Sequence, residues 1–514
     1  MTRSSGVLLH IASLPGSYAI GDLGYEAEKF AAFIKKSGFS VWQVLPTTPV
    51  APVFGNSPYC SSSAFAGNFL FISPDKLYSI GLLSKDDIWP LSVFSNSHAD
   101  YERASEIRIE LLAKAWKRFK SEKSCAQLRS ECDEFRSREK FWLEDYALFS
   151  FFKKKFEGIE WQKWPGDVKH RNFSEETLSL IEEERDKIDF VVFVQFIFAE
   201  QWKSLRMHCK SLGIEIMGDM PMFTASDSAD VWAHPELFDL DSEGLPSSVA
   251  GVPPDYFSTT GQRWGNPVYL WNSRKSELFE WWKVRISSAL NNFDIIRIDH
   301  FRGFCAYWSI PSNEETAVNG RWISAPGRAL LEYLRESLCE EGHNLPLVAE
   351  DLGVITDDVT ALMDDFKLPG MKVLLFAFGG DVGKNPYAPH NIDRNSVTYT
   401  GTHDNNTVLG WWCSESSAGE RLAFKTYCGH NCSGSEAASA MVTLALMSSS
   451  DLAVIPMQDI LGLGGESRMN IPGTASGNWV WRMSDEDFRR ATAEKSPLSM
   501  LYREKNTLYG RFCG

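Results

Sequence analysis

The sequence lacks the patterns that mark several large classes of protein. Its apolar runs fall short of the about 18 residues that a membrane-spanning helix needs. The apolar stretch at residues 6–10 is too short for a signal peptide. The ten cysteines are scattered, without a C-x-x-C pair. The chain also has no phosphate-binding loop, dinucleotide fingerprint or Gly-x-Ser-x-Gly elbow. We therefore expect a cytoplasmic protein with reduced thiols and no cofactor.

Positive charge is also scarce. The chain has 52 Lys and Arg against 67 Asp and Glu, a net charge of −15. Because nucleic acids and anionic membranes repel a polyanion, we expect neither as a partner. A length of 514 residues exceeds the usual size of one domain, so it predicts several domains or one large barrel with insertions. We expect a monomer.

Eight short apolar runs, each ending in polar, glycine or proline residues, recur along the chain. They are residues 6–10, 41–46, 215–223, 295–300, 346–351, 371–378, 397–404 and 452–459. Helical patterns lie between most of them, for example at residues 25–37 and 327–339. This alternation predicts an α/β fold, a (β/α)8 TIM barrel. A doubly wound sheet shows the same alternation, so the number of strands alone does not establish closure.

Two connections between expected strands are longer than a barrel requires. Residues 73–213, after the second strand, are rich in charged residues interleaved with Leu, Phe and Trp, which predicts a largely helical inserted subdomain with a solvated face. Residues 224–284, after the third strand, are aperiodic and predict a loop insertion at the C-terminal face of the barrel, lining the active-site cleft. We expect residues 1–514 to form a single catalytic barrel domain.

Acidic residues follow three of the apolar runs: Asp299, then Glu350 and Asp351, then Asp404. The C-terminal ends of barrel strands meet at one mouth, so these carboxyl groups should converge there. Side chains two residues apart on a strand share a side, so Arg297 should lie beside Asp299 and keep it ionised. Retaining glycoside hydrolysis needs such a set: a carboxylate nucleophile and a carboxylic acid roughly 5–5.5 Å apart. Crowding of like charges raises one pKa and supplies the acid.

Two other interpretations of these residues compete with catalysis. Acidic residues after strands can be helix N-caps, and Arg297 with Asp299 can be a structural ion pair. The pairs Asp299–His300 and His403–Asp404 also offer metal ligands. No H-E-x-x-H or similar chelating spacing accompanies them, so we expect no metal.

Aromatic residues in the predicted loops favour a sugar ligand. The chain has 18 Trp and 15 Tyr. Most are expected in the core, but a ring in a polar loop can stack on the C–H face of a pyranose. The loop aromatics are Tyr59, Trp232, Tyr256, Trp264, Trp308, Trp411, Trp412 and Trp479.

Longer motifs resemble the family 77 glycoside hydrolases, the 4-α-glucanotransferases also called amylomaltases or disproportionating enzymes. The resemblance covers nearly the whole chain except the helical insertion. Its motifs are residues 57–59, 63–68, 227–232, 250–258, 260–267, 297–303, 349–353, 401–407, 458–464 and 473–481.

The resemblance implies a role for each acidic residue. Asp299 would be the nucleophile, Glu350 rather than Asp351 the general acid/base, and Asp404 the transition-state stabiliser. The substrate-binding residues that it implies are Ser57, Tyr59, Asp255, Trp264, Arg297, His300, His403 and Asn478.

The reaction implied is transfer of a segment of an α-1,4-glucan to the 4-hydroxyl of glucose or another glucan, with retention, through a covalent glycosyl–aspartate. Maltooligosaccharides and α-1,4-glucans would be the partners. A retaining α-amylase-like hydrolase would use the same carboxylates and is the alternative.

Some positions depart from the pattern of that family. Asn406 stands where Asp is frequent, and Cys60 and Leu375 where Gln is. These differences could affect chain-length preference but not the three carboxylates. Residues 218–221 lack the Asn-His pattern of calcium-binding α-amylases, so calcium is not implied.

Overall fold

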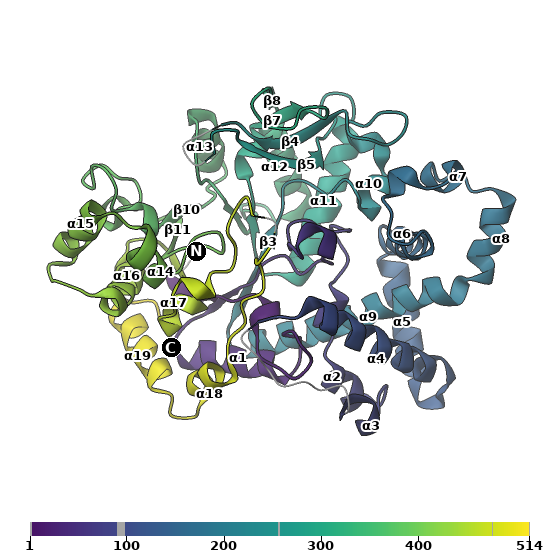
Figure 1. The fold of residues 1–514 in the computed structure, drawn as a ribbon, viewed down its shortest axis with the longest axis horizontal. Coiled ribbons are helices and arrows are strands. Elements are labelled where there is room, and N and C mark those ends of the chain that lie inside the picture. Colours follow the sequence, from purple (N-terminus) through teal and green to yellow (C-terminus); the bar gives the residue numbers. More distant parts are fainter. Residues whose placement is uncertain (1–2, 90–97, 255–257, 475, 513–514) are drawn as a thin grey trace.

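A computed structural model describes residues 3–89, 98–254, 258–474 and 476–512 (Figure 1). At its centre lies a parallel sheet of eight strands, in the order β10-β11-β12-β1-β2-β3-β6-β9. The strands are β1 (Ser4–Leu8), β2 (Val41–Gln43), β3 (Glu215–Met220), β6 (Ile295–Ile298), β9 (Leu347–Ala349), β10 (Gly370–Val373), β11 (Ser396–Tyr399) and β12 (Leu452–Pro456). Each of the eight apolar runs overlaps one of them, and β1, β10 and β11 begin one or two residues before their runs, so the strand prediction is confirmed.

The sheet closes almost completely between its two end strands, β9 and β10. The Ala349 N–H donates to the Pro369 carbonyl over 2.9 Å, and the Met371 N–H donates to Asp351 Oδ1 over 2.6 Å. The fold is therefore a (β/α)8 barrel, as predicted, rather than an open doubly wound sheet.

Helices surround the barrel because each has one apolar face to bury. Helix α1 (Tyr25–Lys36) buries Phe30, Phe33 and Ile34, and α12 (Gly327–Leu338) buries Leu330, Leu331 and Leu334, so both helical predictions are confirmed. The other helices of this layer are α11 (Lys275–Asn292), α13 (Asp357–Asp365), α14 (Val408–Gly410), α15 (Ala418–Cys428), α16 (Gly434–Met447), α17 (Met457–Leu461), α18 (Asp485–Thr492) and α19 (Pro497–Leu508).

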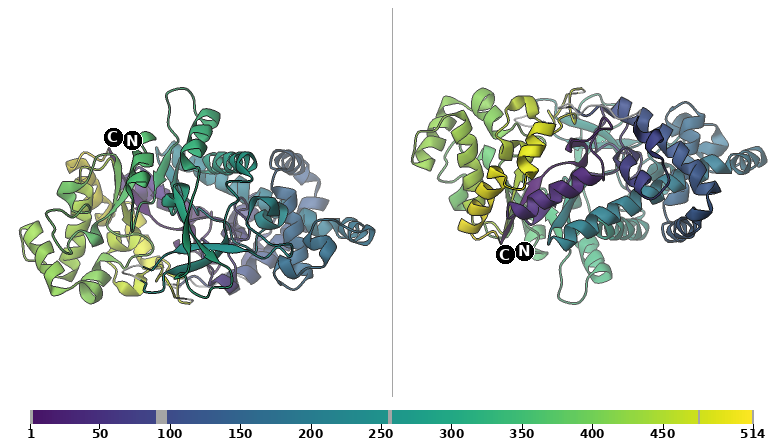
Figure 2. Two further views of the ribbon diagram at one scale, coloured as in Figure 1. Left: turned by 90° about the horizontal axis from the view of Figure 1, so that it is seen from above. Right: turned by 90° about the horizontal axis from the view of Figure 1, so that it is seen from below.

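Between β2 and β3 the chain leaves the barrel and forms a group of helices. They are α2 (Pro74–Ser79), α3 (Lys85–Ile88), α4 (Tyr101–Ser121), α5 (Ala126–Arg138), α6 (Leu143–Lys155), α7 (Gly166–Lys169), α8 (Glu175–Glu183) and α9 (Arg185–Ser211). Helices α5 to α8 lie at one end of the elongated molecule, and α15, α16 and α19 lie at the other (Figure 2). Helix α9 packs against α1 and β3 of the barrel. Helix α9 leads the chain back to β3.

A second, antiparallel sheet lies over the barrel, in the order β5-β4-β7-β8. Its strands are β4 (Ser248–Val252), β5 (Gln262–Pro267), β7 (Ala306–Pro311) and β8 (Arg321–Ser324). Residues 224–284 therefore differ from the loop expected there: they include β4, β5, α10 (Ala229–Ala233) and the start of α11. Strand β4 also pairs with β7, which follows β6 in the chain, so the pairing is not visible within residues 224–284 themselves.

Among the described residues, no helix is long and apolar enough to cross a membrane. The described cysteines are free thiols.

Candidate active site

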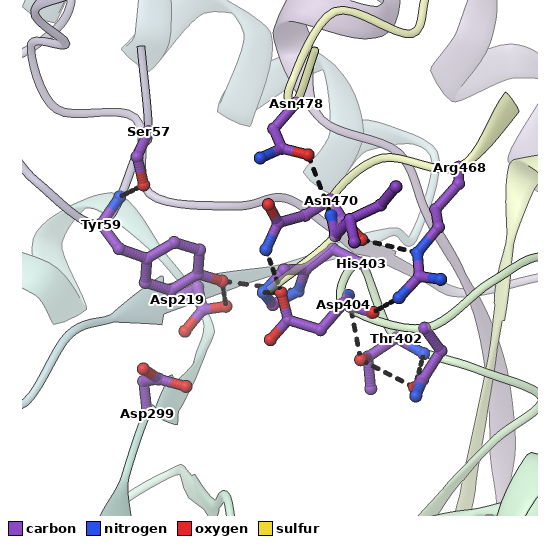
Figure 3. Close-up of polar contacts among 12 residues, drawn as sticks. Ser57, Tyr59, Asp219, Asp299, Thr402, His403, Asp404, Arg468, Asn470 and Asn478 are labelled. Atoms are coloured by element: carbon purple, nitrogen blue, oxygen red, sulfur yellow. Dashed lines mark hydrogen bonds and ion pairs between the residues drawn. The ribbon is translucent and has the colours of Figure 1, made fainter. Parts of the chain in front are cut away.

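The C-terminal ends of the barrel strands bring acidic side chains from distant parts of the chain to one mouth (Figure 3). Asp219 belongs to β3, Asp299 follows β6, and Asp404 follows β11. Tyr59, from the connection after β2, lies among them. The strand positions predicted that Asp299 and Asp404 would lie at this mouth, whereas Asp219 was not predicted.

Arg297 lies between two carboxylates. Its Nη1 donates to both Asp219 oxygens over 2.7 Å, and its Nη2 donates to Asp299 Oδ1 over 2.8 Å. The predicted contact of Arg297 with Asp299 is therefore present. Burial by itself lowers the pKa of Arg297, but Asp219 and Asp299 raise it well above its ordinary value. A permanent cation thus contacts the carboxylate of Asp299.

Asp219 is a site residue that the sequence analysis missed. It is 6% exposed and accepts a hydrogen bond from the Tyr59 hydroxyl over 2.7 Å. Burial raises the pKa of its carboxyl group, although Arg297 opposes the shift. Asp219 lies one residue before the end of β3, within the apolar run of residues 215–223, and a carboxylate so close to a strand end could have identified it.

Glu350 is held by backbone groups. Its Oε2 accepts from the His300 N–H and its Oε1 from the Leu352 N–H, each over 2.8 Å. Burial, and then the charge of Asp299, raise the pKa of Glu350 to about 7, against the opposing effect of Arg297. A carboxyl group with that pKa can donate a proton near neutral pH. Asp351 instead binds the Met371 N–H, on the side of β10.

His300 has an unusual backbone conformation next to Asp299. Its φ of 50° lies in the left-handed region, uncommon for residues other than glycine. In this conformation its N–H binds Glu350. Its ring lies edge-on to Trp264, with centroids 4.8 Å apart. Burial lowers the pKa of the imidazole to about 4, so the ring is neutral near pH 7.

Asp404 is more exposed, with 46% of its side chain accessible. Its Oδ1 accepts from Asn470 Nδ2 over 2.6 Å and lies 3.5 Å from His403 Nε2. Asn470 was also missed, because it lies 66 positions further along the chain and between two of the recognised motifs.

His403 and Tyr59 lie between Asp404 on one side of the mouth and Asp219 on the other. Their rings stack with centroids 5.1 Å apart, and the Tyr59 hydroxyl lies 3.5 Å from His403 Nδ1. Since Tyr59 also binds Asp219, polar contacts run continuously from Asp404 to Asp299.

The remaining predicted residues have different positions. Ser57 Oγ accepts from the Tyr59 N–H over 3.3 Å. Trp264 Nε1 donates to Gln262 Oε1 over 3.1 Å. Asn478 binds within its own loop: its amide donates to the Thr474 carbonyl and hydroxyl, and its oxygen accepts from the Ile471 N–H. Asp255 lies outside the described residues.

Within the described ranges, no cluster of three or more His, Cys, Asp and Glu side chains is arranged to hold a metal ion.

Comparison with known proteins gives a consistent result. A family model described as 4-alpha-glucanotransferase matches residues 9–487. The 4-alpha-glucanotransferase of Aquifex aeolicus is 43% identical over 503 residues, 98% of this chain and 100% of that protein. The enzyme of the same name from Thermus thermophilus is 46% identical over 490 residues, 94% and 95% of the two chains.

Solved structures agree with the sequence relatives. The amylomaltase from Streptococcus agalactiae in complex with acarbose superposes with a TM-score of 0.92 at 36% identity, covering 99% of this chain and 100% of that one. The amylomaltase from Corynebacterium glutamicum, at 18% identity and a TM-score of 0.73, shares the fold.

Proposed function

The chain belongs to the 4-alpha-glucanotransferase family and is a transferase acting on α-1,4-glucans, and on that premise we propose which of its residues carry the reaction. It moves a glucan segment to the 4-hydroxyl of glucose or another glucan by a retaining double displacement. Asp299 is the nucleophile, Glu350 the general acid/base and Asp404 the transition-state stabiliser. The observation that carries this assignment is the contrast between Arg297-bound Asp299 and Glu350, whose pKa is raised to about 7.

In the first half-reaction, Asp299 attacks the anomeric carbon of the donor glucan. The bond from that carbon to the glycosidic oxygen breaks as Glu350 gives the oxygen its proton, and a glycosyl ester forms on Asp299. Loss of the proton leaves Glu350 ionised next to the new ester. The negative charge of Asp404 stabilises the positive charge that develops on the sugar ring.

In the second half-reaction, Glu350 takes the proton of the acceptor 4-hydroxyl. The acceptor oxygen then displaces Asp299 from the anomeric carbon, so two inversions give net retention. Asp299 returns to its ionised state beside Arg297. The acceptor must exclude water from the ester, because a water molecule in its place would complete hydrolysis.

The loops around the mouth form the glucan groove in this proposal. Tyr59, His403 and Trp264 supply rings for sugar stacking, and Arg297 and His300 border the nucleophile. Ser57 and Asn478 act in the groove by holding their loops, and Asp255 contributes a carboxylate. Residues 224–284, with β4 and β5, form one wall of the cleft. Residues 73–213 are an insertion into a single catalytic barrel that spans residues 1–514.

Maltotriose separates transfer from hydrolysis. The transferase releases glucose and builds oligomers longer than maltotriose, whereas the alternative, a retaining α-amylase-like hydrolase, yields only shorter sugars. Chromatography of the early products decides between them. Products no longer than maltotriose would refute the proposed reaction.

We further propose that the enzyme acts as a cytoplasmic monomer without nucleic-acid or membrane partners. The net charge of −15 supports the absence of nucleic-acid and membrane partners, since nucleic acids and anionic membranes repel a polyanion. Sedimentation at the mass of one chain is expected, and a dimer would refute the monomer.

A further inference from the structure

Residues 468–470, which follow β12 and α17, hold Asp404 in place. The Asn470 N–H donates to the His403 carbonyl over 3.1 Å, and Asn470 Nδ2 donates to Asp404 Oδ1 over 2.6 Å. Arg468 Nη2 donates to the Asp404 carbonyl over 2.6 Å (Figure 3). The backbone and the carboxylate of Asp404 are therefore both held by residues 468–470.

Arg468 links the residues that hold Asp404 to Glu415. Its Nε donates to the Asn470 carbonyl over 2.7 Å, and its Nη1 donates to Glu415 Oε1 over 2.9 Å. The same Glu415 oxygen accepts from Asn406 Nδ2 over 2.9 Å. Glu415 ends the π-helical turn Trp411–Glu415, a geometry frequent at functional sites. All three nitrogens of the guanidinium thus join the segments that surround Asp404.

This arrangement also explains Asn406, which departs from the family pattern. Its amide can donate to Glu415, whereas an Asp in its place would set two carboxylates against each other. Asn406 therefore fits the Arg468–Glu415 ion pair of this chain.

The carboxylates of Asp299 and Asp404 are held by different chemistry. Asp299 contacts the cation Arg297, which offsets part of its charge. The closest donor to the Asp404 carboxylate is a neutral amide, at 2.6 Å. A neutral donor fixes the direction of a carboxylate while leaving its charge available to an oxocarbenium-like transition state.

We propose that Asn470, Arg468, Glu415 and Asn406 form a clamp of positioning residues that orients Asp404 in the transition state. Asn470 holds the carboxylate, Arg468 holds the backbone, and Glu415 with Asn406 holds Arg468. The inference rests on the role proposed above for Asp404. In this proposal, none of the four clamp residues touches the reacting atoms.

The first test replaces Asn470 by Ala. The Asn470 backbone N–H is kept, so the loop stays in place, while the carboxylate of Asp404 loses its closest donor. We expect kcat for maltotriose to fall by up to about 100-fold, as for a misplaced catalytic group, with little change in KM or Tm. Asn319→Ala is the matched control, because Asn319 Nδ2 donates to Glu314 Oε2 over 2.9 Å at an exposed position. The control should keep wild-type kcat.

Asn470→Asp gives a readout that a merely structural role would not move. It places a second carboxylate within hydrogen-bond distance of Asp404, and like charges raise the pKa of the pair. Since Asp404 must be ionised to act, the acid limb of the kcat profile should shift to higher pH. Asn319→Asp should leave that limb in place. Wild-type kcat in Asn470→Ala together with an unshifted limb in Asn470→Asp would overturn the clamp.

A double-mutant cycle tests whether Arg468 and Asn470 act on the same group. Arg468→Met combined with Asn470→Ala should lower kcat by less than the product of the two single effects, because both act through Asp404. Multiplicative effects would contradict the clamp. A wild-type enzyme without transfer activity would refute the proposed function, whereas an active wild type with unaffected clamp variants would refute only this inference.

Discussion

The barrel mouth and the helical insertion each contain an arginine that bridges two carboxylates. Arg297 contacts Asp219 and Asp299, and 4% of the Arg297 side chain and none of the Asp219 side chain is exposed. Arg136 contacts Glu144 over 2.7 Å and Asp189 over 2.9 Å, with 31% of its side chain exposed. The connectivity is the same, but the burial differs.

The difference in burial distinguishes charged groups that take part in the reaction from charged groups on a solvated surface. Exposed ion pairs contribute about 0–1 kcal/mol, because water and salt screen them. Arg185 also contacts both Glu144 and Asp189, so these two acidic residues keep a partner if Arg136 is lost. At the mouth, screening is weak, and each charge alters the pKa of its neighbours.

The largest effect is expected at the nucleophile. Asp299→Asn preserves the shape of the side chain but cannot form the glycosyl ester. We expect glucose release from maltotriose to fall by about 10⁴-fold or more, as when other covalent nucleophiles are removed. The melting temperature is the control for folding. Retention of most of the transfer rate would remove Asp299 from its role.

The acid/base comes next. Because Glu350 must be protonated in the first half-reaction, kcat/KM should decline as the pH rises through about 7, the pKa of this group in the folded enzyme. Glu350→Gln should lower the rate by about 10²- to 10⁴-fold and abolish this alkaline limb. An alkaline limb that persists in the variant would assign it to another group.

Asp219→Asn tests the buried half of the comparison. Loss of one partner of a buried pair should lower the free energy of unfolding by about 3 kcal/mol. The field of Arg297 at Glu350 is then less compensated, so the pKa of Glu350 falls and the alkaline limb moves to lower pH. Urea denaturation and the pH profile measure the two effects. A limb that moved to higher pH would contradict the proposed electrostatics.

Arg136→Met provides the exposed half and the smallest effect. We expect a change in the free energy of unfolding of at most about 1 kcal/mol, with the transfer rate unchanged. If Arg136→Met lowered the free energy of unfolding as much as Asp219→Asn does under the same conditions, burial would not be what distinguishes Arg136 from Arg297.

The sequence predicted most of the fold because the barrel strands are short apolar runs with abrupt polar ends. Ile295, Ile296 and Ile298 are all buried in β6, and the charge that follows them marks the mouth. The antiparallel sheet escaped prediction because β4 and β7 pair across the intervening α11 and β6.

The same limit applies to the site. Residues placed by their own strand, such as Asp299 and Asp404, could be predicted. Asn470 could not, because it reaches Asp404 through a loop whose path the sequence does not specify. Strand alternation alone also left open which of Glu350 and Asp351 faces the mouth. The family resemblance favoured Glu350, and in the structure Asp351 accepts from the Met371 N–H instead.

Trapping the covalent intermediate tests the central claim most directly. An α-maltosyl fluoride donor needs no acid to release its leaving group, and the Glu350→Gln variant has no base to activate an acceptor. The glycosyl ester should therefore accumulate and be found by mass spectrometry of peptides from quenched enzyme. We predict the added sugar mass on the peptide that contains Asp299. Sugar found on Asp404, or an unlabelled protein that still consumes the fluoride, would contradict the assignment of Asp299 as the nucleophile.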